Sequence, residues 1–185
     1  MTRYTYPHVL DNGGGETLTF TRQVPGPLGD RLEGDNVVQP GAGPPMHVHY
    51  LQREVLTVVE GRMGWQRHGG PPQFAGVGEA AAFEPGDAHR FWNAGDTPLR
   101  CAGVIEPADN VEYFLTEIFA STRRNGGKRP GVFDAAYLTR RYRSEFAMLA
   151  IPAPVQRIVF PVIVAIGRLL GKYARYAAAP VPVRR

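Results

Sequence analysis

Residues 41–61 read GAGPPMHVHYLQREVLTVVEG, and residues 78–93 read GEAAAFEPGDAHRFWN. In the first stretch His47 and His49 stand two residues apart, so their side chains share a face if the segment is a β-strand. Glu54 follows five residues after His49, and in the second stretch His89 comes just after a proline–glycine turn signal. Three imidazoles and one carboxylate are typical ligands of a transition-metal ion. The two stretches therefore predict strands that bring candidate ligands together.

Short apolar segments surround these two stretches and are separated by glycine and proline. They lie at residues 17–20, 55–59, 63–65, 80–83, 91–93 and 99–105. Many short strands with regular turn signals are typical of a β-sandwich or a β-barrel. No helix-length amphipathic pattern interrupts them, which argues against alternating strands and helices. We therefore predict a mainly β fold that forms a small barrel.

The overall composition indicates one domain with a sizeable appendage. The chain has 185 residues, of which 43% are hydrophobic, and this apolar fraction excludes a disordered chain. It contains 22 glycines and 17 prolines, which favour tight turns over long helices. Cys101 is the only cysteine, so no internal disulfide forms, and residues 1–15 lack the apolar run of a signal peptide. We therefore expect a cytoplasmic protein.

Charge divides the chain into two unequal parts. Residues 1–120 contain 8 Lys and Arg against 15 Asp and Glu, whereas residues 121–185 contain 13 against 2. The formal net charge of +4 thus combines an acidic part with a basic part. Such asymmetry indicates a basic tail or a partner-binding segment. We predict a barrel with the metal site over residues 1–125 and a basic C-terminal helical extension over residues 126–185.

The two stretches resemble the two sequence motifs of the cupin superfamily. The first motif is Gly, five residues, His-x-His, three or four residues, Glu, six residues, Gly, and the matching residues are Gly41, His47, His49, Glu54 and Gly61. The second is Gly, five residues, Pro-x-Gly, two residues, His, three residues, Asn, and the matching residues are Gly78, Pro85, Gly86, His89 and Asn93. The one departure is that Pro85 directly precedes Gly86, after a gap of six residues.

This resemblance covers about residues 15–107. It implies a single cupin barrel (a double-stranded β-helix, or jelly roll), to which the sequence pattern adds a C-terminal α-helical arm. It also implies that His47, His49, Glu54 and His89 bind one divalent transition-metal ion. Several ions suit imidazole and carboxylate ligands, so Fe, Mn, Ni, Co, Cu and Zn all remain candidates.

The fold alone leaves the reaction open, because cupins include oxygenases, isomerases, decarboxylases and binding modules. Our leading hypothesis is a mononuclear metal-dependent oxygenase, a dioxygenase that acts on a small molecule, with Glu54 also serving as a catalytic base. One alternative is a metal-bound module that binds or senses a small molecule without turnover, since no acid or base besides Glu54 stands out. A cupin isomerase is the other alternative.

Aromatic and aliphatic residues near the ligand-bearing strands are candidates for the wall of a substrate pocket. Strand parity places Phe91 and Asn93 on the face of His89, and Leu51 and Leu56 flank Glu54 in the sequence. The substrate-pocket candidates are therefore Leu51, Leu56, Phe91 and Asn93. Each aromatic residue, taken singly, is better explained as barrel core or dimer interface.

The basic part is predicted to be helical. Apolar residues recur at helical spacing over residues 111–122, after the candidate N-cap at residues 109–110. A second short helix follows Asp134, and a third is predicted from Val155 to about Tyr176. Within the third, residues 158–167 carry no charge, but a spanning helix needs about 20 apolar residues. This segment is therefore too short to cross a membrane.

Two interpretations of the third helix stay open. It packs on the barrel or across a dimer, which we favour as the commoner outcome, or it lies as an amphipathic helix on an anionic membrane surface. Nucleic-acid binding is not expected, because the arginines alternate with large aliphatic residues and no recognition motif is present. We expect a small-molecule ligand and a homodimer in which the basic arm docks on an acidic barrel.

Overall fold

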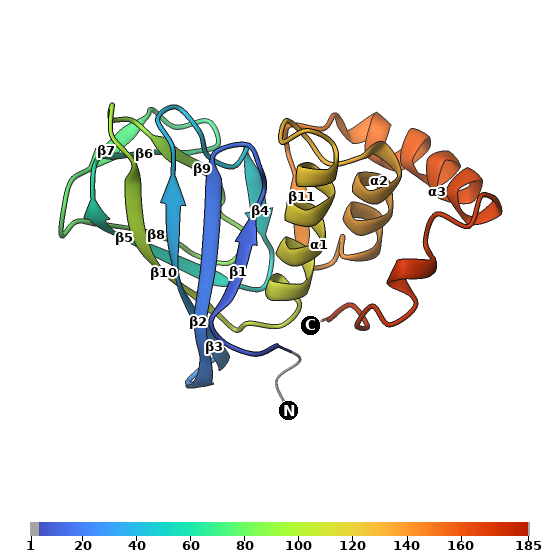
Figure 1. Cartoon of the computed structure of the whole chain (residues 1–185), viewed down its shortest axis with the longest axis horizontal. Coiled ribbons are helices and arrows are strands. Elements are labelled where there is room, and N and C mark those ends of the chain that lie inside the picture. Colours follow the sequence, from blue (N-terminus) through green and yellow to red (C-terminus); the bar gives the residue numbers. More distant parts are fainter. Residues whose placement is uncertain (1–3, 185) are drawn as a thin grey trace.

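The computed structural model describes residues 4–184 and consists of a β-barrel beside a group of helices (Figure 1). The strands are β1 (His8–Asp11), β2 (Glu16–Gly26), β3 (Gly29–Val38), β4 (His47–His49), β5 (Arg53–Glu60), β6 (Met63–Arg67), β7 (Gln73–Ala75), β8 (Ala80–Phe83), β9 (Ala88–Asn93), β10 (Leu99–Glu106) and β11 (Phe146–Met148). They form two antiparallel sheets, with strand orders β1-β2-β3-β10-β5-β8 and β11-β4-β9-β6-β7. The predicted mainly β jelly roll with C-terminal helices is confirmed.

Buried side chains alternate with more exposed ones along the central strands, and the buried ones form the barrel core. In β5, Leu56 and Val58 are buried, whereas Val59 points outward and is exposed. β10 pairs with β3 on one side and with β5 on the other, so its buried residues Leu99 and Cys101 lie at the centre of the larger sheet. Burial raises the pKa of Cys101 to about 12. The single cysteine is therefore an unreactive core side chain.

β2 and β3 differ from the sequence pattern in ways that their pairing explains. β2 continues through Pro25, because β3 pairs with it as far as the hairpin that joins Gly26 to Gly29. β3 has no regular alternation, since Glu33, Gly34 and Asp35 interrupt its apolar residues. Pairing with β2 and β10 on its two sides makes this segment a strand despite its composition.

The helices form the second half of the molecule, which we call the helical region (residues 111–184). It contains α1 (Val111–Arg124), α2 (Val132–Arg141), a π-helix (Val155–Val159), α3 (Phe160–Leu169) and a short 3-10 helix (Ala174–Tyr176). The third predicted helix is thus interrupted, and Gly171 lies just after α3 with a φ of +63°, a conformation that favours glycine. Over residues 4–184, none of the helices combines the length and hydropathy needed to cross a membrane.

A short strand connects the helical region to the barrel. β11 follows α2 and pairs with β4, so that Phe146 lies opposite His49 and Met148 lies opposite His47. The sequence pattern does not predict this strand, because it is only three residues long and directly follows the turn at residues 142–145. Its pairing places residues of the helical region directly beside the strand that carries two candidate ligands.

Candidate metal centre

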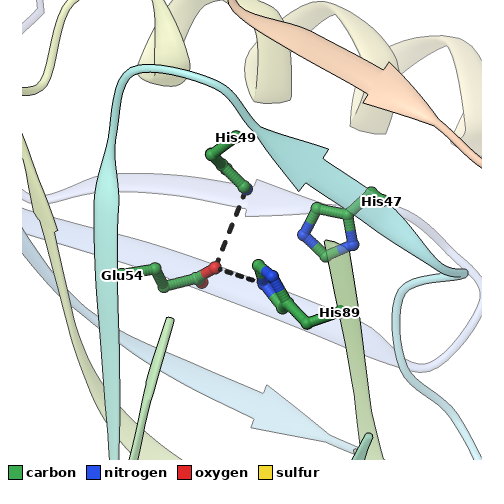
Figure 2. Close-up of side chains that lie close together, drawn as sticks. All are labelled: His47, His49, Glu54 and His89. Carbon is green, nitrogen blue, oxygen red and sulfur yellow. Dashed lines mark hydrogen bonds and ion pairs between the residues drawn. The ribbon is translucent and has the colours of Figure 1, made fainter. Parts of the chain in front are cut away.

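Four polar side chains converge inside the barrel, as Figure 2 shows. β4 carries His47 and His49, β5 carries Glu54, and β9 carries His89. β4 pairs with β9 so that His47 lies opposite His89. One ligand atom from each of the four residues lies within 4.8 Å of all the others. The structure therefore brings together the four residues that the two motifs single out.

A tight turn sets the position of His89. In the turn formed by residues 84–87, the N–H of Asp87 donates to the carbonyl oxygen of Glu84 over 2.9 Å, and Gly86 has a φ of +91°. Proline followed by glycine at the two central positions is typical of a type II turn. The N–H of Gly86 also donates to the carbonyl of His49 over 2.8 Å. The turn thus fixes β9 relative to the strand that carries the other two imidazoles.

Hydrogen bonds determine which imidazole nitrogen faces the centre. His47 Nδ1 lies 2.9 Å from the carbonyl oxygen of Pro45, and His89 Nδ1 lies 2.8 Å from that of Asp87. A carbonyl oxygen only accepts, so each Nδ1 carries a proton and each neutral ring presents a lone pair on Nε2. His89 Nε2 lies 2.9 Å from Glu54 Oε2. Two lone pairs this close need a proton or a metal ion between them, so these donor atoms fit a metal ion.

Burial and mutual proximity set the protonation of the cluster. Burial, reinforced by His49 and His89, lowers the pKa of His47 to about 3. Burial likewise lowers the pKa of His49. Burial alone would raise the pKa of Glu54, but the hydrogen bond to His89 and the nearby imidazoles outweigh it and lower this pKa to about 2. At neutral pH the cluster therefore offers neutral imidazoles from β4 and an ionised carboxylate, as metal binding requires.

Aromatic side chains hold two of the imidazoles in place. Phe83 stacks on His89 with a centroid distance of 3.8 Å and an angle of 3°. Phe146 of β11 packs edge-on against His49 at 5.4 Å. His49 Nδ1 is buried and has no hydrogen-bond partner among residues 4–184, so packing rather than hydrogen bonding orients this ring. The helical region thus supports one of the four candidate ligands.

Three of the four side chains open onto a large apolar cavity. Its volume is about 830 Å³, and His47, His49 and Glu54 belong to its lining. Both halves of the molecule contribute apolar walls, with Leu18, Phe20 and Leu56 from the barrel and Phe114, Phe146 and Phe160 from the helical region. This volume lies within the range of small-molecule sites, which are typically apolar with a few polar groups.

The family comparison agrees with this geometry. Residues 36–105 match the family model Cupin_2, the cupin domain, and this segment includes all four clustered residues. The barrel is a cupin domain. The matched segment ends before α1, so the helical region lies outside it. No curated protein matches the chain.

Three solved structures resemble parts of this chain at low sequence identity and with TM-scores below 0.5. A conserved protein with a double-stranded β-helix domain from Klebsiella pneumoniae is 21% identical, with a TM-score of 0.47, over 58% of this chain and 91% of that chain. A sugar phosphate isomerase of the cupin superfamily from Silicibacter pomeroyi is 24% identical, with a TM-score of 0.43, over 55% of this chain and 66% of that chain. The DMSP lyase DddQ from Ruegeria pomeroyi is 19% identical, with a TM-score of 0.38, over 42% of this chain and 39% of that chain. Each likeness concerns the fold alone.

The four predicted pocket residues fall into two pairs. Leu56 and Phe91 line the cavity of the cupin domain. Leu51 is half-buried in the loop between β4 and β5, and Asn93 is buried at the end of β9. Neither Leu51 nor Asn93 belongs to the lining. Strand parity therefore finds the pocket residues within strands but not those beside a loop or a turn.

Asn93 instead stabilises the turn that follows β9. Its Nδ2 donates to the carbonyl oxygens of Val38 over 2.8 Å and Thr97 over 2.7 Å. Its Oδ1 accepts from the N–H of Gly95 over 2.8 Å. All these contacts are to backbone groups, so the asparagine of the second motif satisfies buried backbone rather than a ligand.

A second buried carboxyl group lines the cavity, and no motif singles it out. Asn36 Nδ2 donates to Glu16 Oε1 over 2.8 Å, and Asn12 Nδ2 donates to Glu16 Oε2 over 3.3 Å. Burial raises the pKa of Glu16 to about 7, although the hydrogen bond from Asn36 opposes this. The sequence signal that could have found Glu16 is its spacing of two and four residues from Leu18 and Phe20. On a strand, this spacing places Glu16 on the same face as these two residues, which also line the cavity.

The two other histidines lie outside the cluster, in agreement with a structural or exposed position for each. His8 Nδ1 contacts Glu112 Oε1 over 2.8 Å and so connects β1 with α1. His68 is exposed in the turn after β6. His68 therefore offers a control for substitutions within the cluster.

Proposed function

We propose that this cupin is a metal-dependent oxygenase that acts on an apolar small molecule. The observation that carries the proposal is the cluster of His47, His49, Glu54 and His89 beside an apolar cavity of about 830 Å³. These four residues would hold one divalent transition-metal ion, with Fe, Mn, Ni, Co, Cu and Zn as candidates. A ligand that fills the cavity contacts the same histidines and carboxylate.

The lining supports an apolar substrate. A polar ligand would leave water and gain few partners along walls that are mostly aliphatic and aromatic. An apolar ligand, in contrast, gains roughly 25 cal/mol for each Å² that it removes from water. Polar groups also belong to this lining: His47, His49, Glu54, Glu16 and Asn36 from the barrel, and Lys128 and Arg129 from the helical region. We therefore propose an apolar molecule whose polar group, such as an enol or a ketone, faces these residues.

The two carboxyl groups suit different tasks. When bound, an iron or manganese ion supplies Lewis acidity and one-electron redox chemistry. Glu54, with a pKa of about 2, remains ionised and is suited to holding the ion. Glu16, with a pKa of about 7, is suited to holding and releasing a proton at its carboxyl oxygen near neutral pH. The apolar walls exclude water from both groups.

Oxygenation is the reaction class that such a substrate favours. A substrate whose polar group is an enol or a ketone offers no ester or phosphate bond for hydrolysis, and dioxygen, which is itself apolar, would enter the same apolar cavity. When both oxygen atoms of dioxygen enter the product, the substrate supplies all the electrons. The reaction then needs no further reductant.

Glu16 favours a second candidate function, a proton-transfer isomerase. A buried carboxyl group that titrates near neutrality can remove a proton from one carbon atom and return it to another. This reaction involves no net oxidation and needs no dioxygen. Its distinguishing product is substrate labelled by solvent deuterium.

Oxygen uptake tests the proposal. Metal analysis of the protein as purified identifies the ion, and the protein loaded with that ion, or with Fe or Mn, is offered apolar enols and diketones in an oxygen electrode. Uptake that requires both ion and substrate supports the oxygenase. Formation of a deuterium-labelled isomer that requires the protein, without oxygen uptake, identifies the isomerase. Tight ligand binding with neither reaction identifies a module that binds or senses a small molecule.

A homodimer, a cytoplasmic location and the division into residues 1–125 and 126–185 also stay proposals. β1 and β8 are the outer strands of the larger sheet, and an outer strand offers unpaired backbone groups to a second copy. Light scattering during size-exclusion chromatography, at low and high salt, measures whether the mass exceeds the 20.3 kDa of one chain. A mass of one chain under both conditions would exclude the dimer.

A further inference from the structure

Helix α3 and the residues beside it expose a face of large aliphatic side chains. The exposed fractions run from 44% for Val159 to 89% for Leu169. We call this set the aliphatic face, and it consists of Ile158, Val159, Val162, Ile166, Leu169 and Leu170. A single exposed aliphatic residue is ordinary, but several on one short segment mark a surface that contacts a partner.

Helical spacing places these side chains on one side of α3. Val162, Ile166 and Leu169 are separated by four and three residues, so they follow one another along the helix. The opposite side is buried, since Phe160 and Val164 pack in a cluster with residues of α2. Figure 1 shows α3 at the end of the molecule away from the barrel. One face of α3 therefore anchors the helix, and the aliphatic face remains open.

The charged residues of the segment that carries the aliphatic face are all basic. The chain contains no Asp or Glu after Glu145. Arg157, Arg168 and Lys172 are exposed within and beside the aliphatic segment. Among residues 4–184, no ion pair includes any of these three side chains. The segment thus combines exposed aliphatic groups with positive charge that nothing in its own sequence neutralises.

We propose that the aliphatic face docks on an anionic membrane surface. Helices of this kind lie in the plane of a bilayer, with aliphatic side chains at the boundary of the acyl chains and Lys or Arg near the headgroups. Acidic headgroups supply the negative charge that residues 146–185 lack. Because no helix of residues 4–184 is suited to crossing a membrane, the contact is peripheral.

A second copy of the chain fits this face less well. A symmetric contact through α3 would bring Arg157 and Arg168 of both copies together, and no acidic residue of the segment would lie between them. Phe160, on the buried side of the same helix, lines the cavity, so docking would place this helix between the cavity and the lipids. The link to an apolar substrate rests on the proposed function, whereas membrane binding itself does not.

Vesicle co-sedimentation of the full chain tests this inference. The protein is mixed with vesicles of phosphatidylcholine alone or of phosphatidylcholine with phosphatidylserine. We expect binding to the anionic vesicles that is at least about tenfold stronger than binding to the neutral ones and that weakens as salt is added. A protein that stays in the supernatant with both kinds of vesicle overturns the proposal, whatever its metal content or catalytic activity.

A matched pair of variants locates the contact. The first variant combines Val162→Glu with Leu169→Glu. The control combines Val77→Glu with Leu28→Glu, which are also exposed aliphatic positions but lie in loops of the barrel. We expect at least about tenfold weaker vesicle binding for the first variant and no change for the control. Equal binding by both variants would place the contact elsewhere and refute the proposal.

Two further measurements separate membrane docking from other outcomes. Arg157→Gln with Arg168→Gln retains the aliphatic face, so we expect it to lose binding to anionic vesicles while its circular dichroism stays unchanged. Light scattering compares the native chain with the variant that carries Val162→Glu and Leu169→Glu. A dimer that this variant converts to a monomer, without vesicle binding by either protein, shows that the aliphatic face joins two copies and overturns the membrane proposal.

Discussion

The barrel buries a central cluster of polar side chains, whereas α3, at the outer end of the helical region, exposes a face of aliphatic side chains. The barrel buries Glu16, Glu54 and His89, and α3 exposes Leu169 and its aliphatic neighbours. A buried polar group requires a partner inside the protein or a ligand, and an exposed apolar face requires a partner outside. The two features therefore indicate an internal site for an ion and a small molecule and an external contact surface.

The two regions nevertheless build the cavity together. Phe146 and Met148 of β11 belong to its lining, and they lie opposite His49 and His47 of β4. The candidate ligands thus depend on side chains that follow them in the sequence by about one hundred residues. Substitutions in the barrel, in the helical region or at the junction between them measure how far metal binding and stability in one region depend on the other.

The largest expected effect is loss of the metal from the barrel. In His89→Ala the cluster loses an imidazole that lies 2.9 Å from Glu54, so we expect metal affinity to fall by at least about 100-fold. Metal content measured by mass spectrometry after gel filtration checks this. His68→Ala is the control, because this exposed imidazole lies outside the cluster. If His89→Ala retains as much metal as His68→Ala, the proposed ligand set is wrong.

The next effect tests the junction between the two regions. Phe146 is buried and packs against His49 and Phe114, so Phe146→Ala should lower the free energy of unfolding by about 3–5 kcal/mol. It should also weaken metal binding by about tenfold, because His49 loses the ring that supports it. Denaturant titration and metal titration provide the two readouts.

Phe74→Ala is the matched control for this substitution. Phe74 lies on β7, is about half exposed, and contacts Trp92 and Arg62 rather than any residue of the cluster. We expect its removal to cost less than about 1 kcal/mol and to leave metal binding unchanged. Unchanged metal affinity in Phe146→Ala, despite lower stability, would show that the barrel positions its ligands without the helical region.

Glu16 provides a pH-dependent test within the barrel. Its pKa is raised from 4.5 to about 7, so below pH 4.5 the carboxyl group is protonated in both the folded and the unfolded chain and contributes no difference. Between pH 4.5 and 7 the unfolded chain releases the proton while the folded chain retains it, which favours unfolding. Above pH 7 this cost is constant, at up to about 3 kcal/mol.

The substitution Glu16→Gln removes this cost and keeps an acceptor for the hydrogen bond from Asn36. The free energy of unfolding of the variant, minus that of the native chain, should therefore rise between pH 4.5 and 7 by up to about 3 kcal/mol. Denaturant titrations of metal-free protein at pH 4.5 and pH 8 measure this difference. A difference that does not change with pH would mean that Glu16 is ionised in the folded chain throughout this range.

Much of the barrel could be predicted from the sequence because its signals are local. Residues two apart share a strand face, so the spacing of His47 and His49 predicts that they converge, and the proline–glycine turn before His89 has a defined geometry. The structure brings these residues together with Glu54 in one cluster. The apolar periodicity of α1 is equally local, and its predicted start at Val111 is confirmed.

The remaining features depend on contacts between distant parts of the chain. Glu16 belongs to the site only because β2 faces the same cavity as β5, and β11 becomes a strand only because β4 offers it an edge. Leu51 and Asn93 lie close to ligands in the sequence, but a loop and a turn direct them away from the cavity. Sequence spacing carries no information on such packing, so the wall that the helical region provides could not be predicted from it.

The smallest expected effect concerns the stability of the helical region. Leu169 is 89% exposed, so Leu169→Ala removes almost no packing and should change the free energy of unfolding by less than about 0.5 kcal/mol. The same substitution at Leu138, which is fully buried in α2, should cost about 2–5 kcal/mol. Thermal or denaturant unfolding measures both costs.

A cost at Leu169 approaching that at Leu138 would mean that the aliphatic face is covered in solution by protein, since lipid is absent from the experiment. A negligible cost, together with weaker vesicle binding, would mean that this side chain contributes to an external contact and not to folding.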